Sequence, residues 1–375
     1  MSEISPFYLD LSTEEKIKLK SIFGEILDSG QLILGKYTDK FESEFANYVE
    51  TKYAVSLNSG TSALEALLIY YNVKGKKIAV PTNTNFASVV TIIRNGGTPI
   101  FLDMDPEYFL PTLENLKYLY KKYQIDGVMW VHIGGIISPE FCEIVKFCRD
   151  NSILLIEDCA HAHGSTLRGK KAGSFGDGGA FSFFPTKVMT TIEGGMITTN
   201  NEKLANIAKS LRNQGKRDGN FGGLHYDMGS SWRISEIAAA MGIVQLNKLD
   251  EMIGRRALGV NILSKVLDNL SVSYCSTSHM DTASHYKFIC KLESEKEVIN
   301  LKKIGKKEGI VFGGGVYDIP CHNHPVFSDI KYLDEEVKNS EEWCKRQACP
   351  PITSGTTIDS AKKIESFFRN YYNGK

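Results

Sequence analysis

The chain has 375 residues, which is long enough for a large hydrophobic core and for two domains. Its 44 basic side chains balance its 44 acidic ones, so there is no net charge to attract nucleic acid or an anionic membrane. The eight cysteines show no C-x-x-C pair, no signal peptide is evident, and no apolar run approaches the roughly 18 residues of a membrane span. These features predict a cytoplasmic protein without membrane or nucleic-acid partners.

The first two thirds of the chain predict alternating strands and helices. A helix begins at the capping-box pattern Ser12–Glu15 and ends at Gly30. After it come short apolar runs bounded by turn residues, which are typical of buried parallel strands. The predicted strands are residues 53–57, 77–81, 99–103, 128–131, 153–156, 179–184 and 195–199. This alternation predicts an α/β fold with a mostly parallel sheet covered by helices on both faces.

The last third predicts a second, smaller α/β domain. Residues 213–231 are rich in Gly, Asn and Asp and are expected to form a long active-site loop. A long helix that starts near Trp232 and carries apolar residues as far as Val260 would then link the two domains. We place the boundary near residue 250, which gives a large domain at 1–250 and a small one at 251–375. The small domain would contain a strand at 286–292 and amphipathic helices near 295–308 and 359–373.

Two reactive side chains follow neighbouring predicted strands. Asp158 comes just after the run 153–156, and Lys187 comes just after the run 179–184. Carboxyl ends of strands in an open α/β sheet form the edge where ligands bind. A lysine that can lose its proton forms a Schiff base with pyridoxal phosphate (PLP), and a carboxylate keeps the ring nitrogen of that cofactor protonated. Without further information, a surface lysine and a helix-capping aspartate remain the alternatives.

A candidate phosphate site lies upstream of these two residues. Residues 59–62 read Ser-Gly-Thr-Ser between a strand and a helix, so hydroxyls and free N–H groups at that helix start could hold the cofactor phosphate together with Ser182. An ordinary helix cap is the alternative.

His161 and His163 follow Asp158 closely, but no Cys or Glu ligand stands at a matching spacing, so we predict no metal.

Several motifs resemble those of the DegT/StrS sugar aminotransferase family. They are Glu157-Asp158-Cys159-Ala160-His161-Ala162-His163-Gly164, Gly176-Asp177, Phe181-Ser182-Phe183-Phe184-Pro185-Thr186-Lys187 and Glu193-Gly194-Gly195-Met196. The resemblance runs from about Phe7 to near the C-terminus. It implies a fold-type-I PLP-dependent transferase with Lys187 and Asp158 as catalytic residues. It also implies a homodimer whose active sites are shared between subunits.

The resemblance assigns further residues to the cofactor. Gly60, Thr61, Ser62 and Ser182 would bind its phosphate. Asn85 stands where the family has an aromatic ring over the pyridine, and Phe86 is the alternative cover. His161 would lie near the cofactor's 3-hydroxyl oxygen. Ser231 stands where the family has an asparagine that reaches the neighbouring subunit's cofactor phosphate.

The same resemblance suggests where the substrate binds. Residues 316–327 resemble the family's P-x-H-x-Q-P-x-Y segment, in which the histidine corresponds to His322 and contacts the sugar. Asn83 and Tyr317, in the same two loops as Asn85 and His322, are the other substrate candidates. His132 follows the strand 128–131 and is either a site residue or a packed histidine.

The predicted reaction is amino transfer. Glutamate would donate the amino group through a pyridoxamine phosphate form of the cofactor, and a nucleotide-linked 3- or 4-keto-6-deoxysugar would accept it in surface-glycan or related sugar biosynthesis. A small phosphorylated ketone, such as dihydroxyacetone phosphate giving serinol phosphate, is the alternative acceptor. The non-enzymatic alternative is a regulatory or interaction protein with the same fold.

Overall fold

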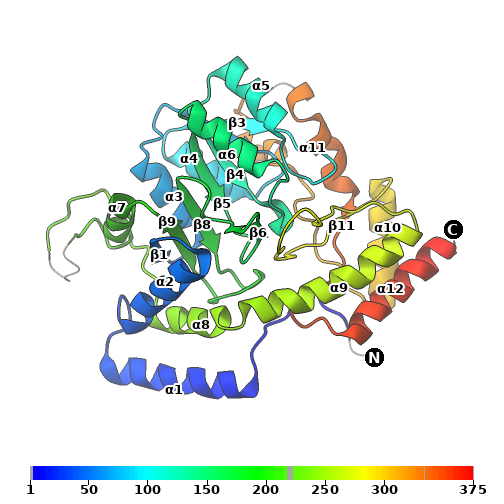
Figure 1. The fold of residues 1–375 in the computed structure, drawn as a ribbon, viewed down its shortest axis with the longest axis horizontal. Coiled ribbons are helices and arrows are strands. Elements are labelled where there is room, and N and C mark those ends of the chain that lie inside the picture. Colours follow the sequence, from blue (N-terminus) through cyan, green and yellow to red (C-terminus); the bar gives the residue numbers. More distant parts are fainter. Residues whose placement is uncertain (1–2, 218–222, 333, 375) are drawn as a thin grey trace.

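The computed structural model describes residues 3–217, 223–332 and 334–374. Among them, a seven-stranded sheet lies at the centre with helices on both faces (Figure 1). In spatial order its strands are β1 (Tyr53–Leu57), β9 (Gly195–Thr199), β8 (Gly178–Ser182), β5 (Leu154–Asp158), β4 (Gly127–Val131), β2 (Lys77–Pro81) and β3 (Thr98–Leu102). β9 is antiparallel to both neighbours, and the other pairs are parallel. The predicted mostly parallel α/β fold is confirmed.

The two faces of the sheet belong to separate hydrophobic cores. In β4, for example, Val128 and Trp130 pack into one core and Met129 into the other, as side chains alternate along a strand. The helices that cover the first face are α2 (Lys36–Val49), α5 (Leu113–Tyr123), α6 (Phe141–Asp150) and α8 (Glu236–Leu246). The helices that cover the second face are α3 (Gly60–Tyr70), α4 (Phe86–Arg94) and α7 (Glu202–Arg212). Because both faces of the sheet are covered, most side chains of these strands are apolar.

A third core forms at the C-terminal end of the chain. It is built from α9 (Leu249–Asn269), α10 (Glu295–Lys307) and α12 (Ile358–Asn373), beside the antiparallel pair β10 (Cys290–Lys291) and β11 (Gln347–Ala348). Apart from α1 (Thr13–Ser29), the remaining regular elements are α11 (Lys338–Trp343), the hairpin β6 (Thr166–Leu167) and β7 (Lys170–Lys171), and short 3₁₀ turns. The predicted helices near 295–308 and 359–373 are confirmed.

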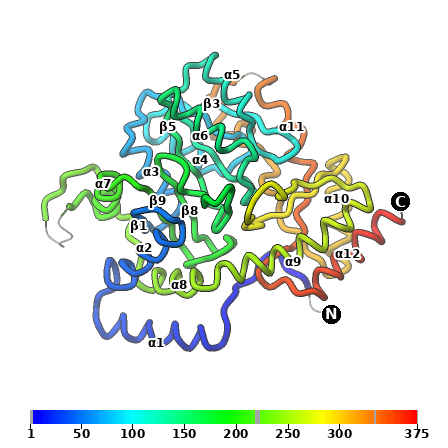
Figure 2. Tube along the Cα trace, in the orientation of Figure 1, coloured from blue at the N-terminus to red at the C-terminus, as the bar shows by residue number. Residues whose placement is uncertain are grey.

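The N-terminal segment lies against this C-terminal core (Figure 2). Ile4 pairs with Ile310 in a parallel bridge, and the N–H of Val311 donates to the carbonyl of Ile4. The first residues therefore pack with the part of the chain that we assigned to the small domain. The division at residue 250 remains a prediction.

Two predicted elements differ from the structure. The long helix predicted after Trp232 is divided into two helices: α8 ends at Leu246 and α9 starts at Leu249. At the break, the Lys248 ammonium pairs with Asp10 and Glu15, while the apolar pattern continues unbroken on both sides. The strand predicted at 286–292 is regular only at Cys290–Lys291; before it, the N–H of Lys287 donates to the carbonyl of Gly134, in the 3₁₀ turn that follows β4.

Helix α1 (Thr13–Ser29) begins at the predicted capping box, in which Ser12 and Glu15 bond to each other's backbone. Of its apolar residues, Ile26 is buried, whereas Ile17 and Leu27 are 62% and 56% exposed. The helix thus presents apolar side chains outward from this chain. Within the described residues, no helix is both long and apolar enough to cross a membrane.

Candidate active site

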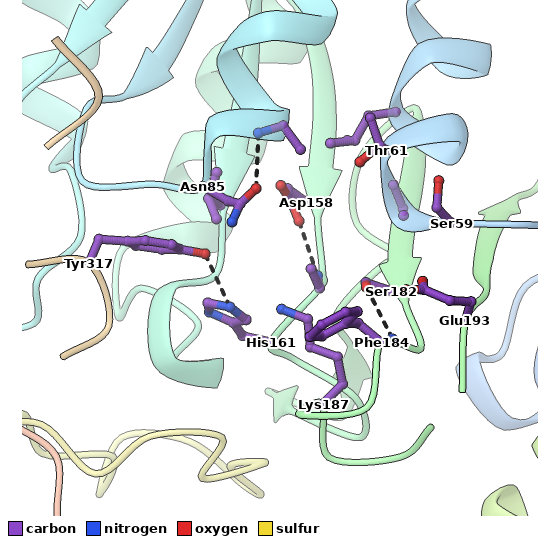
Figure 3. Close-up of a pocket in the computed structure, with 16 residues that line it drawn as sticks. Ser59, Thr61, Asn85, Asp158, His161, Ser182, Phe184, Lys187, Glu193 and Tyr317 are labelled. Carbon is purple, nitrogen blue, oxygen red and sulfur yellow. Dashed lines mark hydrogen bonds between the residues drawn. The ribbon is translucent and has the colours of Figure 1, made fainter. Parts of the chain in front are cut away.

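Asp158 ends strand β5 and is buried at the carboxyl edge of the sheet (Figure 3). The Ser88 hydroxyl donates to one carboxylate oxygen at 2.9 Å, and the Ala160 N–H donates to the other at 3.1 Å. Burial raises the pKa of Asp158 above its ordinary value, although these two hydrogen bonds and the nearby Lys187 act in the opposite direction. A buried carboxylate of this kind is stabilised by a cation or an N–H donor within hydrogen-bond distance of its oxygens.

Lys187 lies in the loop that follows β8, the strand next to β5. It lines the same cavity as Asp158, a space of about 270 Å³. Its Nζ lies 4.9 Å from the centre of the Tyr286 ring, and within the described residues no carboxylate forms an ion pair with it. The two residues that follow neighbouring strands in the sequence are therefore brought together in one cavity.

The start of helix α3 forms another wall of the cavity. Ser59 caps this helix by accepting from the N–H of Ser62, and Gly60 and Thr61 in its first turn line the cavity together with Ser182. A Cβ on Gly60 would lie 2.8 Å from the Cβ of Ser182, so glycine lets the helix start approach the strand end closely. Free N–H groups at a helix start suit a phosphate. The Ser62 hydroxyl bonds instead to Asn58 and Ser59, and it does not line the cavity.

Asn85 and Phe86 take different positions. The Asn85 side chain caps helix α4 through the N–H of Ala87 (2.9 Å) and also lines the cavity. The Phe86 ring stacks on Phe327 at 5.5 Å, is 46% exposed and does not line the cavity. In this chain the loop therefore offers an amide to the cavity and keeps its aromatic ring outside.

His161 and Tyr317 line the opposite side of the cavity from Thr61 and Ser182 (Figure 3). Nε2 of His161 lies 3.2 Å from the Tyr317 hydroxyl. The His161 ring also stacks on Tyr286, with 4.1 Å between ring centres. Residues from before and after position 250 of the chain thus meet on this side of the cavity.

Three other candidates lie outside the cavity of this chain. His322 is buried, and its ring nitrogens contact the Thr82 hydroxyl and, at 2.7 Å, the Glu341 carboxylate. Asn83 is buried and donates to the carbonyl of Phe109 at 2.8 Å. Ser231 is exposed and bonds to Arg233, and part of its loop, 218–222, lies outside the described residues. The roles assigned to these three residues remain predictions.

His132 is a fully buried histidine that contacts Glu157 at 3.1 Å. Together with Cys159 these side chains form the group of potential metal ligands found among the described residues. The Glu157 oxygens, however, already accept from the N–H groups of Gly173, Phe175 and Gly176. Glu157 therefore holds the loop before β8 in place through hydrogen bonds to its backbone.

Several residues of the site were not predicted as such. Phe184 and Glu193 line the cavity, and both stand within the motifs that carry the family resemblance. Ser88, which holds Asp158, and Tyr286, which stacks on His161, are distant in sequence from their partners. The spacing of residues along the chain gives no signal for such contacts.

The sequence profile of the DegT/DnrJ/EryC1/StrS aminotransferase family matches residues 13–369. The chain belongs to this family. The predicted PLP-dependent aminotransferase fold is confirmed, and so is the prediction of an enzyme of the PLP-dependent aminotransferase type.

Individual members of the family are similar along most of the chain. GDP-perosamine synthase of Vibrio cholerae is 30% identical over 361 residues, which cover 94% of this chain and 96% of that protein. The dTDP-3-amino-3,6-dideoxy-alpha-D-galactopyranose transaminase of Aneurinibacillus thermoaerophilus is 34% identical over 245 residues, 64% of this chain and 65% of that one. The crystal structure of DesV from S. venezuelae superimposes with a TM-score of 0.90 at 26% identity and covers 99% of each chain.

Proposed function

We propose that this aminotransferase binds PLP through Lys187 and moves an amino group from glutamate to a nucleotide-linked 3- or 4-keto-6-deoxysugar. The observation that carries the proposal is one cavity that combines Lys187, the buried carboxylate of Asp158 and the start of helix α3. These groups match the aldehyde, the ring nitrogen and the phosphate of PLP, respectively. The residues present therefore fit this cofactor.

Each residue would have a defined task in the reaction. Bound PLP supplies an electron sink for charge that develops at the substrate carbon. Asp158 holds the proton on the ring nitrogen, because a buried carboxylate favours a positively charged neighbour. Lys187 acts as the general base and acid that moves a proton at the α-carbon of the amino donor. Gly60, Thr61 and Ser182 hold the phosphate and so fix the ring close to Lys187.

The names of the relatives support a sugar acceptor. GDP-perosamine synthase and the dTDP-3-amino-3,6-dideoxy-alpha-D-galactopyranose transaminase are both named for sugars linked to a nucleotide. Neither name specifies the acceptor of this chain, which departs from the family pattern at Asn85, at Ser231 and at His324, the residue that stands in place of the glutamine of P-x-H-x-Q-P-x-Y. Dihydroxyacetone phosphate is therefore kept as the alternative acceptor.

We also infer that the enzyme works in the cytoplasm as a homodimer. Ile17, Phe23 and Leu27 of α1 are exposed, and a second copy of the chain would cover apolar side chains of this kind. Ser231 is exposed outside its own cavity, which is consistent with a role in the cavity of a neighbouring subunit.

Amino transfer from ¹⁵N-labelled glutamate identifies the acceptor. The purified enzyme loaded with PLP is incubated with labelled glutamate and one ketone at a time: a nucleotide-linked 3-keto-6-deoxysugar, its 4-keto isomer or dihydroxyacetone phosphate. We expect ¹⁵N in the nucleotide sugar, detected by mass spectrometry, and none in the triose phosphate. The Lys187→Ala variant is the blank, because it lacks the amine that moves the proton.

Two results would contradict this assignment. Label that enters only serinol phosphate would establish the alternative acceptor. Label that enters none of the ketones, while 2-oxoglutarate is released from glutamate, would show that the donor is correct and that the acceptor belongs to another class.

A further inference from the structure

The proton position on His161 follows from its hydrogen-bond partners. The backbone N–H of Gly134 donates to Nδ1 at 3.3 Å, and Nε2 lies 3.2 Å from the Tyr317 hydroxyl. A backbone N–H can only donate, so Nδ1 accepts and the neutral ring carries its proton on Nε2. Burial, together with the charges of Lys187 and Lys287, lowers the pKa of His161 well below its ordinary value, so the ring is neutral. The Nε2–H of His161 therefore donates to the Tyr317 oxygen.

Ring packing holds this arrangement in place. The His161 ring lies on Tyr286 with 4.1 Å between centres and 23° between planes, and it is within 18° of parallel to the Tyr317 ring. A rotation that aimed Nε2 elsewhere would break the Gly134 hydrogen bond and this stacking together. His161 has no proton left to offer to a ligand.

Asn85 also turns towards the Tyr317 hydroxyl. Its Oδ1 accepts from the Ala87 N–H, which directs its NH₂ group towards Tyr317 (Figure 3). The Tyr317 oxygen thus accepts from His161, and the Asn85 amide lies on the same side of the cavity. A hydroxyl group has two acceptor lone pairs and one proton. The Tyr317 proton is therefore the one available to donate into the cavity.

Three anchors orient PLP in this cavity, in line with the proposed function on which the present inference rests. Asp158 would hold the ring nitrogen, Lys187 the aldehyde carbon, and Gly60 and Thr61 the phosphate. The phenolic oxygen of PLP projects from the ring edge opposite the phosphate arm. In the cavity, the side opposite Thr61 and Ser182 is the side of Tyr317 (Figure 3).

We propose that Tyr317 donates the hydrogen bond to the phenolic oxygen of PLP, and that His161 is a positioning residue that orients Tyr317. This assignment differs from the role implied by the family resemblance, in which His161 itself lies at that oxygen. It also gives a function to Asn85, the amide that stands where the family has an aromatic ring.

A donor at the phenolic oxygen has a spectroscopic consequence. The phenolate charge stabilises the proton on the nitrogen that joins Lys187 to PLP, and a hydrogen bond from Tyr317 withdraws part of that charge. The Tyr317 hydroxyl therefore lowers the pKa of the Lys187–PLP chromophore, which is read from its visible absorbance as a function of pH. Its removal should raise this pKa by about one unit, the scale of one charge-assisted hydrogen bond.

The experiment compares PLP-loaded variants by pH titration of the visible absorbance. Tyr317→Phe should shift the chromophore pKa upward by about one unit, and His161→Leu should shift it in the same direction. The double variant should shift no further than Tyr317→Phe alone, because one residue acts through the other. His161→Gln keeps a donor for Tyr317 and should titrate near the wild type. Tyr274→Phe, which removes only a hydroxyl bonded to the exposed side chain of Asp268, is the matched control.

The other titratable groups around these two residues remain in place in all variants. They are Lys187, Lys287, His163, Tyr286, Asp158 and Cys321. A Tyr317→Phe enzyme that titrates like the wild type would overturn the proposal, as would shifts that add in the double variant, since His161 would then contact the cofactor itself. A wild-type protein without any Lys187-dependent chromophore would instead refute the proposed function.

Discussion

Replacing Lys187 by alanine should reduce amino transfer by at least about 10⁴-fold, because the residue that would bind the cofactor and move the proton is removed. The variant should also lose the visible absorbance that the wild-type protein shows with PLP. Its fold should be retained, since Lys187 lies at the cavity wall and forms no ion pair within the described residues. Activity assays, absorbance spectra and thermal unfolding of the two proteins measure these three effects.

Lys287 provides a stringent control for this experiment. Its Nζ lies 5.7 Å from the centre of the same Tyr286 ring that Lys187 approaches at 4.9 Å. Lys287→Ala removes a neighbouring amine, and it should keep the chromophore. A Lys187→Ala protein that retained full turnover would end the proposed mechanism.

Asp158→Asn should change stability and activity in opposite directions. Because burial raises the pKa of Asp158 in the folded protein, the ionised carboxylate costs stability as the pH rises through that pKa. Asparagine removes this cost, so the PLP-free variant should be more stable than the wild type at neutral pH by about 1 kcal/mol. Amino transfer should fall by about 10²–10³-fold, because the ring nitrogen of the cofactor loses the charge that keeps it protonated.

Asp177→Asn is the matched control for Asp158→Asn. Asp177 accepts from the N–H of Leu155 near the opposite end of β5, and burial raises its pKa as well. It does not line the cavity, so its replacement should leave PLP binding and turnover unchanged. Chemical unfolding of PLP-free protein and kinetics of PLP-loaded protein are measured for both variants. A PLP-free Asp158→Asn protein that is less stable than the wild type, or a fully active one, would contradict the assigned role.

The strands of the central sheet and the presence of Asp158 and Lys187 in one cavity could be predicted from the sequence. Each strand is a short apolar run ended by turn residues, and this pattern is local. The carboxyl ends of parallel strands share one edge of the sheet, so side chains that follow β5 and β8 can be expected in one crevice. The cap of helix α3 at Ser59 is likewise a short-range signal.

Contacts between distant segments could not be predicted in this way. The apolar pattern continues on both sides of Asn247 and Lys248 and gives no signal for the break between α8 and α9, where Lys248 pairs with the distant Asp10 and Glu15. Tyr317 and His161 are 156 residues apart, and their hydrogen bond exists only because the C-terminal part of the chain folds over the sheet edge. The sequence around Phe86 gives no signal that its ring stacks on Phe327, away from the cavity.

Borohydride reduction followed by peptide mass mapping tests the central claim most directly. The wild-type protein is incubated with PLP, reduced and digested, and the peptides are searched for the mass of a reduced PLP adduct. We expect one labelled peptide, with the adduct on the side chain at position 187. A label on another lysine, or none, would contradict the proposed role of Lys187.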